Sequence, residues 1–141
     1  MGFVARSRCS FRRAAMRKRP LEGCHVLIVE DEYLVAADLA AALEEFGAVV
    51  LGPVGSVKDA LDQIAHNGEN LDAAVLDINL RGETVYPVAA KLYALNVPFV
   101  FTTGYDADGI PSLYSEVPRL EKPADLGKLV RILENTQRHV A

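Results

Sequence analysis

Five side chains of this sequence could take part in chemistry, and each lies at or just after the end of a short apolar run. They are Glu30, Asp31, Asp77, Thr103 and Lys122. The run before Asp77, Ala73–Leu76, is typical of a strand buried on both faces. A carboxylate at the end of such a strand either caps the next element or reacts with a ligand, and its neighbours decide which.

The rest of the sequence alternates between apolar runs and helical patterns. We expect strands at 25–29, 49–51, 73–76, 97–101 and 117–120, and helices at 33–46, 56–66, 85–95 and 125–137. Gly47 is placed to end the first helix, and Ser56 with Asp59 resembles a capping box for the second. A further helix, the fourth in chain order, would fall at 105–115, but Gly109 and Pro111 interrupt this segment, so we expect it to be short or irregular.

Strands that alternate with helices over short connections form a parallel sheet with helices on both faces. We therefore predict an α/β fold with one five-stranded parallel sheet in the order 2-1-3-4-5, as in flavodoxin-like proteins. In that order the first and third strands are neighbours. Glu30 and Asp31 should then lie beside Asp77.

Three carboxylates at one edge raise one another's pKa values, and a divalent cation removes the conflict. Oxygen ligands favour a hard ion such as Mg²⁺. The backbone carbonyl of Asn79 can face the same ion, while Thr103 offers a hydroxyl and Lys122 an ammonium. This combination suits phosphoryl transfer to an aspartate, in which the carboxylate attacks and the cations neutralise the phosphoryl oxygens.

These residues lie in four short motifs, which together resemble the receiver domain of two-component response regulators over about 25–138. The motifs are Val29-Glu30-Asp31-Glu32, Leu76-Asp77-Ile78-Asn79, Thr102-Thr103-Gly104 and Lys122-Pro123. The resemblance implies that Asp77 is the phosphoacceptor. It also implies a Mg²⁺ site formed by Glu30, Asp31, Asp77 and the backbone carbonyl of Asn79. Thr103 and Lys122 would contact the phosphoryl group.

The segment 98–105 is similar to the Phe-Ala-Thr-Gly-Tyr motif of a receiver subfamily. Its members are often stand-alone regulators that work with histidine kinases of the HWE or HisKA2 type. Thr102 stands where that motif has Ala. Most receivers have an aromatic residue three positions before the Lys, but this chain has Arg119 there. We therefore expect the signal to be relayed by another route than the usual Thr–aromatic pair.

The charges are unevenly distributed. Residues 1–20 carry seven Arg or Lys and no acid, whereas residues 21–141 carry eight basic groups against 19 acidic ones. We interpret 1–20 as a basic, disordered tail and 21–141 as a single receiver domain, and we leave open that the tail is a tether to a membrane or nucleic acid. The acidic balance argues against nucleic acid as a partner of the folded domain.

Two features bear on the compartment. No apolar stretch approaches the ~20 residues that a membrane-spanning helix needs. Cys9 and Cys24 are too few and too isolated for a disulfide framework, so we expect free thiols in a reducing compartment and a cytoplasmic protein.

The sequence thus predicts a stand-alone response regulator rather than an enzyme with a separate substrate. A histidine kinase or phosphotransfer protein would phosphorylate Asp77, and the domain, without an output domain, would signal to a protein partner. It would catalyse only its own phosphorylation and slow dephosphorylation. A phosphate sink or shuttle remains an alternative. An aspartyl-phosphate hydrolase is disfavoured because those enzymes place Asp-x-Asp after the first strand, and a dinucleotide binder because that loop lacks glycines.

Overall fold

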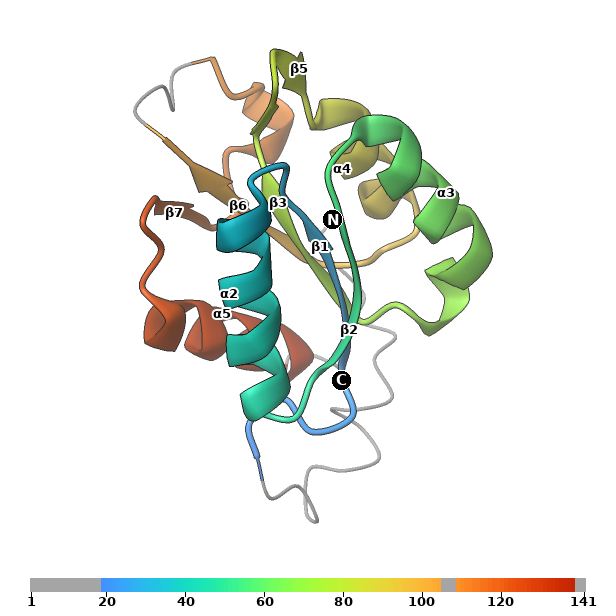
Figure 1. Ribbon diagram of the computed structural model, residues 1–141. Coiled ribbons are helices and arrows are strands. Elements are labelled where there is room, and N and C mark those ends of the chain that lie inside the picture. The colour runs from blue at the N-terminus through green and yellow to red at the C-terminus, as the bar shows by residue number, and fades with distance from the viewer. Residues whose placement is uncertain (1–18, 105–108, 139–141) are drawn as a thin grey trace.

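The computed structural model describes residues 19–104 and 109–138, which form a five-stranded parallel sheet between two layers of helices (Figure 1). The strands of the sheet are β1 (His25–Val29), β2 (Val49–Val54), β3 (Ala73–Asp77), β6 (Phe99–Thr103) and β7 (Arg119–Glu121). Their order, β2-β1-β3-β6-β7, is the predicted 2-1-3-4-5 order. The predicted fold class is confirmed.

The helices in the described part of the chain are α2 (Tyr33–Glu45), α3 (Val57–Asn67), α4 (Tyr86–Ala94) and α5 (Leu126–Arg138). Their apolar side chains divide into two cores, one on each face of the sheet. Helices α2 and α5 pack with alternate residues of the strands, such as Val75 and Val100. Helices α3 and α4 pack with the residues in between, such as Leu76 and Phe101. Because side chains alternate along a strand, every apolar run of the central strands is buried on both faces.

The boundaries differ from prediction where pairing between strands decides them. We expected β2 to end before Gly52, but it continues to Val54, whose carbonyl accepts a hydrogen bond from the Glu30 N–H at 2.8 Å. Pairing with β3 and β7 likewise brings Thr102 and Thr103 into β6. Residues 79–84, for which no strand or helix was predicted, contain a short hairpin of β4 (Asn79–Leu80) and β5 (Glu83–Thr84).

The region predicted to hold a short or irregular fourth helix contains one 3₁₀ turn, Ser112–Tyr114, in its described part. Residues 105–108 lie outside the described residues. Tyr114 of this turn is buried and packs against Tyr86, Phe99 and Phe101 at ring-centroid distances near 6 Å. The turn therefore covers one end of the α3–α4 core in place of a helix.

At the amino-terminal side, residues 1–18 of the predicted tail lie outside the described residues. Leu21 is fully buried in the core with α2 and α5. The prediction of two free thiols is wrong for Cys24, which is disulfide-bonded. The spacing of two cysteines carries no information on pairing, and Cys9 lies outside the described residues. Over the part of the chain that can be described, no helix has the length and apolarity to cross a membrane.

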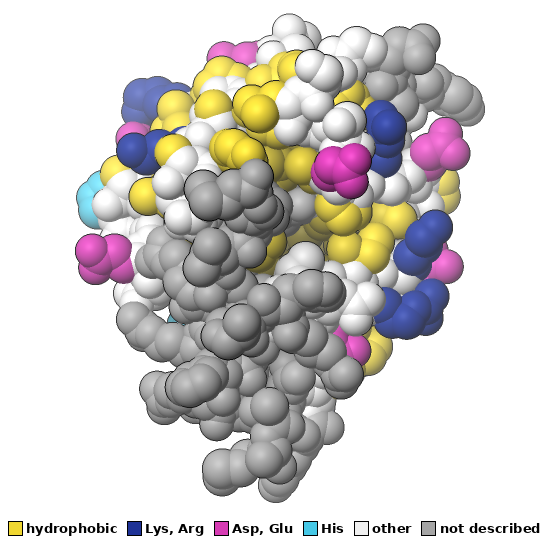
Figure 2. Space-filling view, turned by 180° about the vertical axis from the view of Figure 1, so that it is seen from behind, with side chains coloured by type: hydrophobic (Ala, Val, Ile, Leu, Met, Phe, Trp, Pro, Cys, Tyr) yellow, Lys and Arg dark blue, Asp and Glu magenta, His cyan; other side chains and the backbone are white. Residues whose placement is uncertain are grey.

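Charged and apolar side chains are mixed on the surface. On the face behind the view of Figure 1, Lys and Arg side chains lie among Asp and Glu side chains, and apolar side chains are visible between them (Figure 2). Tyr33 and Leu34 at the start of α2 are exposed large apolar residues.

Helix α3 begins with the predicted cap. The Ser56 hydroxyl accepts a hydrogen bond from the Asp59 N–H at 3.1 Å and satisfies one of the free donors of the first turn. Ser56→Ala should lower the free energy of unfolding by about 1 kcal/mol, measured by urea titration. Ser56→Asp keeps an acceptor at this position and should stay close to the parent protein. An equal loss in both variants would contradict the capping role.

Candidate functional site

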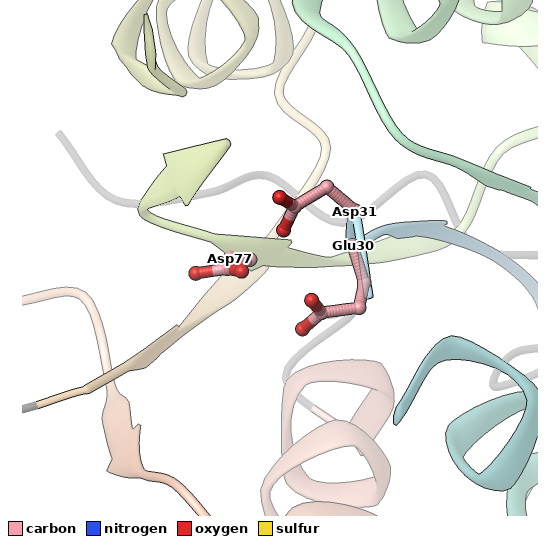
Figure 3. A group of neighbouring side chains, drawn as sticks. All are labelled: Glu30, Asp31 and Asp77. Atoms are coloured by element: carbon pink, nitrogen blue, oxygen red, sulfur yellow. The ribbon is translucent and has the colours of Figure 1, made fainter. Parts of the chain in front are cut away.

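The acidic residues predicted to meet do meet at the carboxyl edge of the sheet. Glu30 and Asp31 directly follow β1, and Asp77 ends β3, the strand beside it. One carboxylate oxygen from each residue lies within 4.8 Å of the others. Figure 3 shows the side chains of Glu30 and Asp31 extending from the end of β1 toward Asp77. The predicted adjacency of the first and third strands therefore produces the cluster.

Lys122 reaches the cluster from the end of β7, two strands away from β3 at the same edge of the sheet. Its Nζ donates a hydrogen bond to Asp77 Oδ2 at 2.8 Å and lies 2.8 Å from Glu30 Oε1 as an ion pair. It also reaches Glu32 Oε1 at 3.4 Å. Burial lowers the pKa of Lys122, but the hydrogen bond to Asp77 and the close negative charges of Asp77 and Glu30 outweigh it and raise the pKa above its usual value. The ammonium therefore stays charged.

Glu30 is the carboxylate of the cluster whose charged form is most disfavoured by burial. Only 3% of it is exposed, and burial raises its pKa to about 7, against the opposing effects of Lys122 and the Glu32 N–H. Its Oε1 has no hydrogen bond of suitable direction among the described residues, although Lys122 lies close. A buried anionic oxygen without such a bond is unfavourable unless a cation neutralises it.

The residues present fit a divalent metal ion. Three carboxylates converge, one of them almost fully buried. They are opposed by the ammonium of Lys122 and by the exposed guanidinium of Arg81, whose Nε lies 3.4 Å from Asp31 Oδ2. A hard cation such as Mg²⁺ prefers this all-oxygen donor set. The fit is judged from the ligand type, which is carboxylate oxygen at all three residues.

Asn79 and Thr103 lie at the same edge. They line a cleft of about 370 Å³ together with Asp31, Asp77 and Lys122. The Asn79 N–H donates to Asp77 Oδ1 at 3.2 Å and so fixes the rotation of that carboxylate. Thr103 is buried, and its hydroxyl makes a long hydrogen bond of 3.4 Å to the carbonyl of Gly104. All six predicted site residues are thus brought together.

Two further residues of the site were given no role from the sequence. Arg81 has a positive φ of 55° in the turn of the β4–β5 hairpin, and its side chain reaches Asp31. Glu32 contacts Lys122. A basic residue in the loop after Asp77 is a usable signal in the sequence, but only the hairpin turns it toward the first strand.

Arg119 lies on the other face of the sheet from Asp77. It is exposed and stands opposite Phe101 in register. Its charge also acts on Tyr86, although burial raises the pKa of that phenol overall. The position of the usual aromatic switch is therefore occupied by a cation beside a cluster of aromatic rings.

The structure is similar to solved structures of receiver domains. No family model and no curated protein matches the chain. A solution structure of SdrG from Sphingomonas melonis Fr1 is 39% identical, with a TM-score of 0.70 over 80% of this chain and 95% of that one. The signal receiver domain of a modulated diguanylate cyclase from Desulfovibrio desulfuricans G20 is 33% identical, with a TM-score of 0.69 over 80% of this chain and 92% of that one. The chain belongs to the receiver domain family.

This receiver domain also resembles SdrG in a second state. The BeF₃-activated conformation of SdrG from Pseudomonas melonis Fr1 is 37% identical, with a TM-score of 0.66 over 83% of this chain and 98% of that one.

Proposed function

We propose that Asp77 accepts a phosphoryl group from the phosphohistidine of a partner histidine kinase or phosphotransfer protein. The observation that carries this proposal is the Lys122 ammonium 2.8 Å from Asp77 Oδ2, beside the carboxylates of Glu30 and Asp31. The activated form of SdrG with BeF₃, a mimic of a phosphoryl group, supports the same chemistry.

The transfer needs mainly positioning and charge neutralisation. An oxygen of the Asp77 carboxylate attacks the phosphorus, the new O–P bond forms, and the P–N bond to the imidazole breaks with its electron pair returning to the ring. The Asn79 N–H holds the other oxygen of the carboxylate. Lys122 neutralises charge on the phosphoryl oxygens, and Thr103 at the cleft wall donates its hydroxyl to one of them.

A metal ion belongs to this proposal. Glu30, Asp31, Asp77 and the backbone carbonyl of Asn79 would hold Mg²⁺, which supplies positive charge to the phosphoryl oxygens when bound. Within the chain itself, the N–H of Glu32 donates to Glu30 Oε2 at 3.0 Å and orients this ligand.

The phosphorylated domain signals to a protein partner. Phosphorylation adds about −1.5 to −2 charges at one edge of the sheet, which draws Thr103 and its loop toward Asp77 and biases a two-state surface. In this proposal the protein is a cytoplasmic phosphoacceptor and not an enzyme for a separate substrate: it promotes only its own phosphorylation and slow dephosphorylation. The resemblance of 98–105 to the Phe-Ala-Thr-Gly-Tyr motif supports a stand-alone role with a kinase of the HWE or HisKA2 type.

The proposal is tested on the unmodified protein. Incubation with acetyl phosphate and MgCl₂ should add one phosphoryl group, detected by intact mass, and peptide mapping after reductive trapping should place it on Asp77. The same incubation with EDTA should give little or no label. A label on another residue, or equal labelling in EDTA, would contradict the proposed site.

A further inference from the structure

Lys122 reaches its partners by crossing a strand. The residue directly follows β7, whereas Asp77 ends β3, and β6 runs between these two strands. The Lys122 Nζ nevertheless lies 2.8 Å from Asp77 Oδ2. The side chain of Lys122 must therefore pass over the carboxyl end of β6.

Thr102 is the β6 residue on the face that Lys122 crosses. In register it stands opposite Asp77 on one side and Leu120 on the other. Paired residues of neighbouring parallel strands share a face of the sheet, whereas the next residue, Thr103, points to the other face. Thr102 and Lys122 also line one cavity of about 360 Å³ between α2, β6 and α5.

The hydroxyl of Thr102 is buried and makes no hydrogen bond with the residues that the structure describes. The residue as a whole is 2% exposed. Burying a hydroxyl without a partner is unfavourable, and a valine of the same shape would avoid the penalty. The hydroxyl is therefore available to a partner in another state of the site.

We propose that Thr102 is a positioning residue for Lys122, whose ammonium donates a hydrogen bond to the Thr102 hydroxyl as the phosphoryl group is transferred to Asp77. This inference rests on the proposed function. In the structure the ammonium is held by Asp77 Oδ2 and Glu30 Oε1. Phosphorylation moves the negative charge from the Asp77 carboxylate to the phosphoryl oxygens, and the ammonium must follow it.

The geometry makes Thr102 the partner for the displaced ammonium. Thr102 is next to Asp77 in register and lines the same cavity as Lys122, and its hydroxyl oxygen can accept a hydrogen bond. A bond from Nζ to this oxygen keeps Lys122 over β6, where the cation faces the phosphoryl group. The hydroxyl then lowers the barrier to labelling without contributing to the stability of the unphosphorylated protein.

Thr102→Val and Thr102→Ser test this inference in the full chain. The rate of labelling by acetyl phosphate at saturating MgCl₂ should fall about three- to tenfold in Thr102→Val, the loss expected for the net contribution of one ordinary hydrogen bond. Thr102→Ser keeps the hydroxyl and should label at close to the parent rate. Thermal unfolding without Mg²⁺ should show Thr102→Val at least as stable as the parent, because an unsatisfied hydroxyl is removed.

Each other outcome overturns the inference. Thr102→Val that labels at the parent rate shows that the hydroxyl is idle. Thr102→Ser that labels as slowly as Thr102→Val shows that keeping the hydroxyl does not preserve the rate, so the hydroxyl is not what positions Lys122. If Thr102→Val does not fold, Thr102→Ala takes its place in the same comparison with Thr102→Ser. Failure of the parent protein to label on Asp77 would contradict the proposed function instead, and the two failures are therefore distinguishable.

Discussion

Asp77→Asn is expected to lose all labelling by acetyl phosphate and MgCl₂, whereas Asp72→Asn should keep it. Both carboxylates are buried, and they stand at opposite ends of the same strand: Asp72 just before β3 and Asp77 at its last residue. An asparagine at 77 removes the nucleophile and one ligand of the proposed metal site. Asp72 lies at the amino edge of the sheet, away from the cleft. Intact mass and peptide mapping give the readout.

Asp72→Asn, which should keep labelling, is expected to lose more stability than Asp77→Asn. Asp72 Oδ2 accepts a hydrogen bond from the His25 N–H at 2.8 Å and lies 3.4 Å from His25 Nδ1. Asp72→Asn should lower the free energy of unfolding by about 1–2 kcal/mol, because a charged acceptor becomes a neutral one. Asp77→Asn keeps an acceptor for Lys122 and relieves the repulsion with Glu30, so its loss without Mg²⁺ should be smaller. If Asp77→Asn still labels, or if Asp72→Asn labels no better, the assignment of the nucleophile is wrong.

The central sheet and the site could be predicted because both depend on short stretches of sequence: apolar runs for the strands and polar residues directly after them. The runs at 25–29 and 73–76 are apolar at every position, as strands with helices on both faces must be. The alternation of strands and helices predicted a parallel sheet, and the strand order common in flavodoxin-like sheets placed Glu30 beside Asp77. The site residues could be named because the carboxyl ends of parallel strands share one edge.

Features that depend on contacts distant in the sequence could not be predicted. Val54 is in a strand because the Glu30 N–H bonds to its carbonyl, although Gly52 and Pro53 read locally as a strand end. Arg81 reaches Asp31 only because a two-stranded hairpin turns it back. The unsatisfied Thr102 hydroxyl is visible only once the register with Asp77 is known.

Lys122→Met is expected to slow labelling about 10²- to 10³-fold and to destabilise the metal-free protein. The ammonium is the group nearest to where charge develops, and removing one such group commonly has this effect on rate. Without it, Asp77 Oδ2 and Glu30 Oε1 lose their shared cation inside a largely buried cluster. Breaking a fully buried pair costs about 3–5 kcal/mol; because 19% of the Lys122 side chain is exposed, we expect about 1–3 kcal/mol here.

The dependence on Mg²⁺ separates this effect from a general loss of packing. A metal ion bound to Glu30, Asp31 and Asp77 replaces the missing positive charge, so MgCl₂ should stabilise Lys122→Met more than the parent protein, in which the ammonium competes for the same carboxylates. Urea unfolding in EDTA measures the stability of the metal-free protein, and the difference from unfolding in MgCl₂ measures the stabilisation by Mg²⁺. Lys128→Met, an exposed lysine on α5, is the matched control and should change neither labelling nor the response to Mg²⁺. An equal gain from MgCl₂ in Lys122→Met and in the parent would mean that the ammonium and the metal ion do not share these carboxylates.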